Sequence, residues 1–100
     1  MNPTRAEALA AVEAALDYAY AKHGRDPWGR HEFFGVLYEE MQKELGDAIF
    51  ADEPIEHVLE EAIQVAAVCI RYLETGDRYR GPHPPLPQKV WRPGINATEP

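Results

Sequence analysis

The chain has a single cysteine, Cys69, and no long apolar run, and these two scarcities narrow what it can be. One cysteine cannot form a disulfide within the chain, and it stands in a strongly apolar stretch, which favours a reducing cytoplasm. No segment approaches the roughly 18 uninterrupted apolar residues typical of a membrane-spanning helix, and the N-terminus lacks a signal-peptide core. We therefore expect a cytoplasmic protein with no membrane partner.

Positive charge is also scarce. Ten lysines and arginines face seventeen carboxylates, which gives a net charge of −7 at pH 7. This balance argues against a nucleic acid polymer as a partner, and it suits divalent cations. The chain lacks a glycine-rich phosphate loop, and it lacks the histidine that a zinc-protease motif needs four residues after His31. An apolar content of 45% over 100 residues predicts one modest folded domain.

Three helices are predicted in the first 77 residues, so the expected fold class is all-α, a three-helix bundle. The first helix begins at a capping box of Thr4 and Glu7 and ends at Gly24. The second covers about residues 30–50, and its apolar side chains recur at helical spacing. The predicted apolar arc of this helix consists of Phe34, Leu37, Met41, Leu45 and Ala48.

The third helix is predicted to start with Asp52 as its cap and Pro54 near its first turn. Its predicted core face consists of Ile55, Val58, Leu59, Ala62, Ala66, Cys69 and Leu73. Between residues 62 and 73 the only polar residues are Gln64 and Arg71, so this helix is apolar on almost every side. Two other short helices cannot easily cover such a surface, so we expect self-association into a homodimer or homotetramer.

The chain changes character after residue 77. Five prolines between Pro82 and Pro93 exclude a regular helix, and arginines and a lysine make the segment basic. We therefore divide the chain into an all-α helical domain at residues 1–77 and an extended, proline-rich, basic C-terminal arm at residues 78–100. The spacing of Pro82 and Pro85 also matches ligands of SH3-type domains, which leaves peptide recognition as a further role for the arm.

Ten of the seventeen carboxylates fall within residues 32–61, where Lys43 is the only fixed positive charge. On the second helix, Glu40, Glu44 and Asp47 are spaced i, i+4 and i+7, which places them on one flank. Like charges at this spacing are destabilising. Such a row persists most readily if it is fully solvated or if a cation neutralises it.

The third helix offers a second row of ligands. Glu61 has His57 one turn before it and Gln64 one turn after it on the same stripe. If the two helices pack antiparallel, the rows can face each other and hold Mg²⁺ or Mn²⁺, which prefer oxygen ligands. The alternative is that both rows are the solvated faces of two amphipathic helices.

Two stretches resemble a known family. Residues 31–40 (HEFFGVLYEE) and 60–68 (EEAIQVAAV) resemble the MazG-like, all-α nucleoside triphosphate pyrophosphohydrolases, especially the small phage and bacterial forms. The resemblance covers roughly residues 16–74. Members of that family assemble as homo-oligomers and use an E-x-x-E motif on one helix and an E-x-x-D motif on the next to hold Mg²⁺ at a triphosphate. The resemblance implies hydrolysis of a nucleoside triphosphate to the monophosphate and pyrophosphate.

In this resemblance Glu40 and Glu61 are the leading carboxylates of the two motifs and the catalytic candidates. The partner position of Glu40 holds Lys43, so Glu44 can act as a ligand only if the helix shifts or rotates slightly. The partner position of Glu61 holds Gln64, which supplies a neutral oxygen. The implied metal ligands are Glu40, Glu44, Glu61, Gln64 and Asp47.

Lys43 and Arg71 are the candidates for binding the nucleotide substrate. An alternative keeps the fold but not the chemistry. Lys43 then replaces a metal ligand and pairs with Glu39, four residues earlier. The chain would in that case be a non-catalytic homo-oligomeric helical scaffold, or a nucleotide-binding accessory protein of a phage or bacterium.

Overall fold

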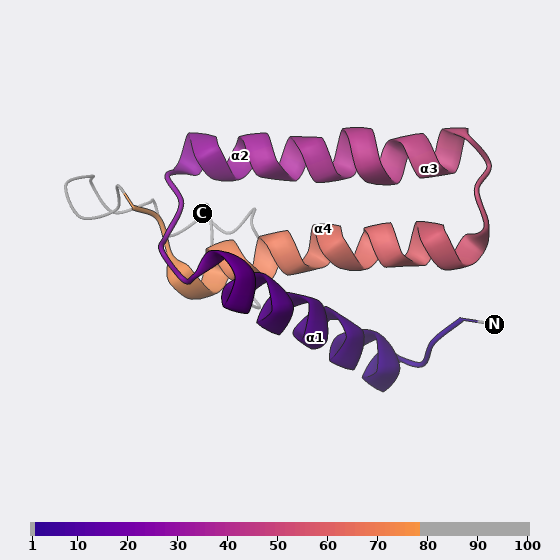
Figure 1. Cartoon of the computed structure of the whole chain (residues 1–100), viewed down its shortest axis with the longest axis horizontal. Helices are drawn as coiled ribbons and strands as arrows, with labels where there is room; N and C mark the ends of the chain where they lie inside the picture. Colours follow the sequence, from indigo (N-terminus) through magenta and orange to yellow (C-terminus); the bar gives the residue numbers. More distant parts are fainter. Residues whose placement is uncertain (1, 79–100) are drawn as a thin grey trace, which may run out of the picture.

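The computed structural model describes residues 2–78, which form three helical rods and no strand (Figure 1). The rods are α1 (Arg5–His23), the continuous series α2 (Arg30–Tyr38), η1 (Glu39–Leu45) and α3 (Gly46–Phe50), and α4 (Ile55–Thr75). The predicted all-α class and its three helices are confirmed. Within these residues no helix has the length and apolar character needed to cross a bilayer. The predicted arm, apart from Arg78, lies outside the described residues.

Most helix ends follow the predicted signals. The Thr4 hydroxyl accepts from the Glu7 amide at 3.1 Å, and the Glu7 carboxylate accepts from the Thr4 amide at 2.9 Å, so the capping box is confirmed. Helices α1 and α4 both end at a glycine with positive φ, 82° at Gly24 and 80° at Gly76. Glycine adopts this conformation without a steric penalty, which is why it stops a helix.

The start of α4 differs from the prediction. The helix begins at Ile55 with Pro54 as its N-cap, so the prediction that Asp52 caps it is wrong. Asp52 instead has a φ of 58° in the turn between α3 and α4. Aspartate tolerates this left-handed conformation better than most residues do. The turn allows α4 to run back along the rod that precedes it (Figure 1).

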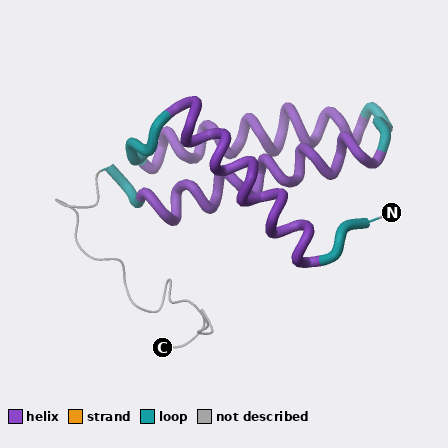
Figure 2. The backbone as a smooth tube through the Cα atoms, turned by 60° about the horizontal axis from the view of Figure 1, so that its bottom comes forward, coloured by secondary structure: helices purple, strands orange, loops and turns teal. Residues whose placement is uncertain are grey.

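Helix α4 is the centre of the molecule. The second rod runs antiparallel to it, and α1 crosses it at an angle (Figure 2). Within residues 2–78, α1 packs on α4 and not on the second rod. The main apolar cluster accordingly lies between α1 and α4, where Val12 and Leu16 meet Ala67. Side chains of α1, the second rod and α4 together line a cavity.

The predicted core face of α4 is partly wrong. Ile55, Ala62 and Leu73 are exposed, and the residues of α4 that are buried are Ala67 and Arg71. The reason is that α4 is covered from two directions, by α1 and by the second rod. Its buried surface is therefore wider than a single stripe and has a different centre.

The predicted apolar arc of the second rod is wrong at Phe34 and at Met41, which is 47% exposed. Phe34 is 63% exposed, whereas its neighbour Phe33 stacks on Tyr72 of α4 with ring centroids 4.0 Å apart. Val36 also lies on the inner side of the rod, and Ala48 is buried further along it. In an unbroken α-helix these last two residues would lie about 120° apart around the axis, so they could not both face inward.

The π-helical segment η1 removes this mismatch. The Gly46 amide donates to the carbonyl of Met41, five residues earlier, so this turn holds one residue more than an α-helical turn. One extra residue brings Ala48 back to within about 20° of Val36. Glycine suits position 46 because a Cβ there would lie 3.3 Å from the Met41 carbonyl oxygen. Both ends of the rod can therefore pack on α4.

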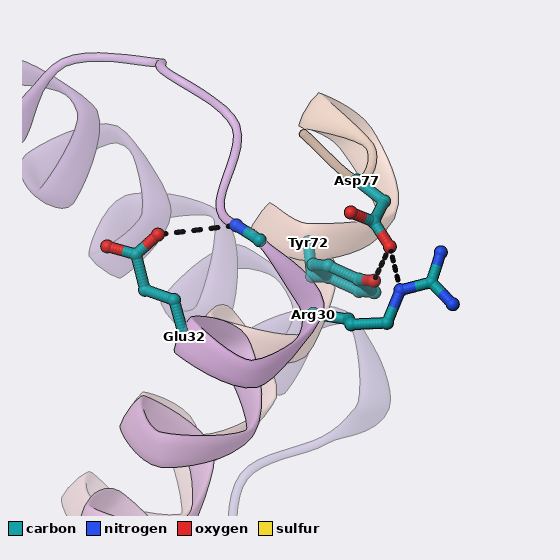
Figure 3. Close-up of polar contacts among 5 residues, drawn as sticks. Arg30, Glu32, Tyr72 and Asp77 are labelled. Atoms are coloured by element: carbon teal, nitrogen blue, oxygen red, sulfur yellow. Dashed lines mark hydrogen bonds and ion pairs between the residues drawn. The ribbon is translucent and has the colours of Figure 1, made fainter. Parts of the chain in front are cut away.

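A polar latch closes the end of the molecule where the α1–α2 loop meets the end of α4 (Figure 3). The carboxylate of Asp77 accepts from Arg30 Nε at 2.7 Å and from the Tyr72 hydroxyl at 3.1 Å. The Arg78 amide donates to the carbonyl oxygen of Trp28 at 2.9 Å. The latch fixes the loop that carries Trp28, whose side chain borders the cavity.

Candidate functional site

The packing of η1 on α4 brings two of the predicted carboxylates toward each other. Glu40 lies on η1 and is half-buried, and the Glu61 side chain on α4 is 15% exposed. Burial raises the pKa of Glu40, and the negative charges of Glu61, Glu44 and Glu39 raise it further. A carboxylate from each of two helices therefore contributes to one region of concentrated negative charge.

Glu44 also adds its charge to this region, and it lies in the same π-helical segment as Glu40. In an α-helix, a residue four positions after Glu40 lies about 40° further around the axis. The wider turn of η1 reduces this rotation. Glu44 is exposed, yet its charge still contributes to the raised pKa of Glu40. The resemblance implies that Glu44 can act with Glu40 only if the helix shifts locally, and the segment between these two residues is π-helical.

His57 stands beside Glu61 at the outer edge of this region. Its Nδ1 contacts the Glu53 carboxylate, and its Nε2 lies 3.5 Å from Oε2 of Glu61. The hydrogen bond to Glu53, and then that group's charge, raise the pKa of His57, and Glu61 and Glu60 add to the effect. A protonated His57 thus places some positive charge next to the carboxylates.

A cavity of about 360 Å³ opens beside Glu40, between α1, the second rod and α4. Three of the predicted site residues line it, namely Glu40, Gln64 and Arg71. Much of the remaining wall is apolar and includes Leu16 and Val36. Small-molecule pockets are typically about 300–1,000 Å³, with apolar walls and a few polar groups that orient the ligand. This cavity has that character and lies near the lower end of the range.

Arg71 has the most unusual surroundings of the three. It is only 9% exposed, and its guanidinium carbon lies 4.0 Å from the centre of the Trp28 ring. Its Nη2 donates to the carbonyl of Asp26 at 3.5 Å, whereas its Nε is buried without a hydrogen-bond partner within residues 2–78. No carboxylate in that part of the chain forms an ion pair with it. Arg71 therefore brings an unsatisfied donor to the cavity wall.

Two predicted site residues lie outside the cavity. Lys43 is exposed, and its Nζ lies 3.6 Å from the Glu39 carboxylate. Asp47 is exposed and is not among the charges that shift the pKa of Glu40. The seven predicted residues therefore fall into three groups: a cavity group of Glu40, Gln64 and Arg71, a neighbouring pair of Glu44 and Glu61, and an outer pair of Lys43 and Asp47.

The sequence alone does not find Trp28 or His23, which also line the cavity. Trp28 lies in the short loop between α1 and α2, and His23 is the last residue of α1. The one feature of the sequence that could have pointed to this part of the cavity is the presence of Trp28 in a short loop. A large aromatic ring in a loop between two helices usually packs against another side chain. In this structure the partner of Trp28 is the guanidinium group of Arg71.

The donor set can be compared with the needs of Mg²⁺. Within the described residues, no group of three or more histidine, cysteine, aspartate or glutamate side chains forms a metal site as it stands. Glu40 and Glu61 nevertheless offer carboxylate oxygens, and Gln64 offers an amide oxygen at the cavity wall. Burial is the main cause of the raised pKa of Glu40, and the repulsion from Glu61, Glu44 and Glu39 that adds to it is what a divalent cation would relieve. The residues therefore fit Mg²⁺ in ligand type and in charge.

Comparisons of the chain with protein-family models, with curated proteins and with solved structures found no match. Functional inference therefore depends on the carboxylates and the cavity themselves.

Proposed function

We propose that this chain is a MazG-like nucleoside triphosphate pyrophosphohydrolase, which uses Mg²⁺ or Mn²⁺ to produce a nucleoside monophosphate and pyrophosphate. One observation carries the proposal: Glu40 and Glu61 contribute to a single region of negative charge beside a cavity that suits a small molecule. A bound Mg²⁺ would polarise the phosphoryl group and make a nearby water more acidic. The single half-buried thiol of Cys69 is compatible with the cytoplasmic location we propose.

The residues would divide the work by position. Glu40 and Glu61 would hold the cation from two packed helices, which fixes its position better than one helix alone could. Gln64 would add a neutral oxygen from the cavity wall. Glu44 and Asp47, both exposed, would act through the waters that Mg²⁺ retains.

The second candidate is a non-catalytic helical scaffold, or a phage or bacterial accessory protein that binds nucleotides on the same fold. The pair between Lys43 and Glu39 favours it, because Lys43 occupies a motif position and neutralises a nearby carboxylate. Both side chains are well exposed, at 64% and 66%, so this ion pair contributes little to stability.

We also propose that the chain self-associates as a homodimer or homotetramer. Phe34, Tyr38 and Met41 are exposed and follow one another at helical spacing along the second rod. The rings of Phe34 and Tyr38 have centroids 6.4 Å apart, so the apolar stripe is continuous there. Such stripes are typical of surfaces that another protein covers. Analytical ultracentrifugation that finds only the monomer at micromolar concentration would contradict this proposal.

Pyrophosphate release tests the enzymatic proposal. Wild-type protein supplied with Mg²⁺ and each common nucleoside triphosphate should release pyrophosphate and the matching monophosphate. Glu61→Gln keeps the side chain's shape but removes its charge, so we expect turnover to fall at least about 100-fold with the circular dichroism unchanged. Glu60→Gln is the matched control, because Glu60 is exposed on the same helix and should be dispensable.

Two results would overturn parts of this proposal. Normal turnover by Glu61→Gln would remove Glu61 from the mechanism. Failure of the wild type to release pyrophosphate from any of the nucleotides would favour the scaffold.

A further inference from the structure

We propose that a second copy of this chain docks on an apolar stripe of α4, with the α4 helices of the two copies antiparallel. The stripe consists of Ile55, Ala62, Cys69 and Leu73. This inference rests on the self-association proposed above, to which it adds a surface, an orientation and a register. The stripe lies on a different helix from the exposed Phe34, so the two surfaces can be tested separately.

The four side chains of the stripe share one face of α4. Successive members are seven, seven and four residues apart, so they lie within about 40° of one another around the helix axis. Ile55 is 52% exposed and Leu73 is 66% exposed. Ala62 is exposed as well, and Cys69 is half-buried. No charged side chain interrupts the stripe over its length of about 27 Å. Contiguous apolar surface of this kind often marks a contact with another protein chain.

The described helices cover other faces of α4. Helix α1 packs on Ala67, and the second rod stacks Phe33 on Tyr72. Around the axis of α4, Ala67 lies about 120° from Leu73 in one direction, and Tyr72 lies about 100° from it in the other. The stripe therefore faces away from both neighbours, on the side of α4 that they leave open.

The order of large and small side chains makes the stripe complementary to itself. Residue 64 is the midpoint between Ile55 and Leu73. In an antiparallel pair with both midpoints at the same level, Leu73 lies opposite Ile55 of the partner subunit. In the same register Ala62 lies opposite Ala66 of the partner subunit. Small side chains at the centre let two helices approach closely, while the larger ones fill the space at both ends. A two-fold dimer requires such a match, because both copies use the same patch.

The charges near the two ends of α4 favour the antiparallel orientation. Residues 47–56, around its start, hold four carboxylates and no lysine or arginine. The loop from α1 to α2 meets its other end, and there residues 22–30 hold one lysine and two arginines against one carboxylate. The charges of residues 71–78, two arginines and two carboxylates, cancel. An antiparallel pair brings the acidic end of each copy to the basic end of the other. A parallel pair would bring the two acidic ends together.

Crosslinking through one introduced cysteine tests the orientation and the register. In full-length chains that also carry Cys69→Ala, Ala62→Cys places a thiol about 6 Å along α4 from its counterpart in the partner subunit. A short bismaleimide should therefore join the two copies, which a denaturing gel shows as a covalent dimer. Leu73→Cys should give none, because its counterpart lies about 27 Å away along the helix. Efficient crosslinking of Leu73→Cys would indicate parallel helices and overturn the inference.

A charge at the centre of the stripe tests whether this surface holds the copies together. Ala62→Glu would bury a carboxylate without a partner, and two-fold symmetry would place it in the contact twice. Analytical ultracentrifugation at micromolar concentration should then find at most half as many copies per assembly as in the wild type. Ala14→Glu is the matched control, because Ala14 is exposed on α1 and faces away from the buried Val12 and Leu16. It should leave the assembly unchanged, and both variants should keep the wild-type circular dichroism.

Other outcomes separate this inference from the proposals on which it rests. A wild type that is only monomeric would contradict both the self-association and the docking on α4. If Phe34→Glu dissociates an assembly that Ala62→Glu leaves intact, the self-association stands and this inference is overturned. Pyrophosphate release enters none of these measurements, so a protein without turnover can still support the inference.

The reactivity of Cys69 distinguishes a second copy from cover by the chain's own residues 79–100. Docking of a second copy predicts that the thiol reacts more slowly with a maleimide as the protein concentration rises through the dissociation constant. Cover within one chain predicts a reactivity that does not depend on concentration. A concentration-independent reactivity would therefore overturn the inference.

Discussion

The two halves of the second rod differ in what they present to α4. Helix α2 presents an aromatic ring, Phe33, which stacks on Tyr72, and its first residue, Arg30, belongs to the latch. Segment η1 presents Glu40, whose neighbours include the like charges of Glu61 and Glu44. Contacts of the first kind stabilise the fold, whereas those of the second kind weaken it. The contrast indicates that α2 holds the rod in place, and it supports the role that we propose for the carboxylates of η1.

The backbone shows the same contrast. Helix α2 is regular, and η1 holds one residue more per turn. Wide turns of this kind are uncommon and occur frequently at functional sites. In this rod the wide turn also adjusts the helical phase, so that Val36 and Ala48 both face inward. The irregular half of the rod also carries two of the candidate metal ligands, Glu40 and Glu44.

Deletion of single residues should distinguish the two halves most strongly. Removing Gly35 from α2 would rotate Phe33 by about 100° relative to Ala48, so one of the two must leave its packing site. We expect a loss of at least about 3 kcal/mol in the free energy of unfolding. Removing Gln42, which is exposed in η1, should convert the wide turn to an α-helical turn and keep both flanks in phase. We expect this deletion to cost less than about 1 kcal/mol in urea unfolding. Equal costs would mean that η1 holds no extra residue.

Truncation of Phe33 should test what anchors α2. Phe33→Ala removes a half-buried ring and its stacking on Tyr72, so we expect unfolding to require about 2–3 kcal/mol less. Phe50→Ala is the chemically matched control at the end of the same rod, where the side chain is 89% exposed. It should change stability by less than about 0.5 kcal/mol. Similar losses in the two variants would remove the special role of the ring stack.

The carboxylates of η1 should make stability depend on pH. Because the pKa of Glu40 is raised in the folded protein, the folded chain binds that proton more tightly than the unfolded chain. Stability should therefore fall as pH rises from about 4.5, the group's ordinary value, through the raised pKa. Glu40→Gln should reduce this fall and raise the melting temperature at pH 7 by about 2–4 °C without Mg²⁺.

Two checks isolate the contribution of Glu40. Glu13→Gln, an exposed change on α1, should leave the slope of stability against pH unchanged. The raised pKa of His57 adds a separate fall that begins only above 6.5, so measurements between pH 4 and 6 avoid it. A Glu40→Gln variant with the wild-type slope in this range would show that neither burial nor the neighbouring charges raise the pKa of Glu40 in the folded chain.

Local signals in the sequence were enough to predict the helices. The Thr4 capping box and the stop at Gly24 depend on residues close in sequence, and both are present. The phase of the second rod was not predictable in this way. Choosing Phe33 over Phe34 as the packed ring requires the tertiary contact with Tyr72, and an extra residue in a helical turn leaves little local trace beyond Gly46.

In the candidate site, too, some contacts could be predicted from the sequence and others could not. The sequence predicted that the rows carrying Glu40 and Glu61 would face each other if their helices packed antiparallel, and the structure shows that antiparallel packing (Figure 1). The contact between Arg71 and Trp28 depends on a loop that folds back against the end of α4. Residues so distant in sequence carry no shared periodicity, so only the folded chain shows that they meet.

Calorimetric titration with Mg²⁺ at pH 7 tests most directly whether Glu40 and Glu61 share a divalent cation. We expect saturable binding by the wild type and a matching rise in melting temperature, equivalent to about 2.7 kcal/mol when Mg²⁺ is present at 100 times its dissociation constant. Glu61→Gln should lose both signals, and Glu60→Gln should keep them. Absence of binding heat and of any thermal shift in the wild type, or identical binding by Glu61→Gln, would contradict the shared cation.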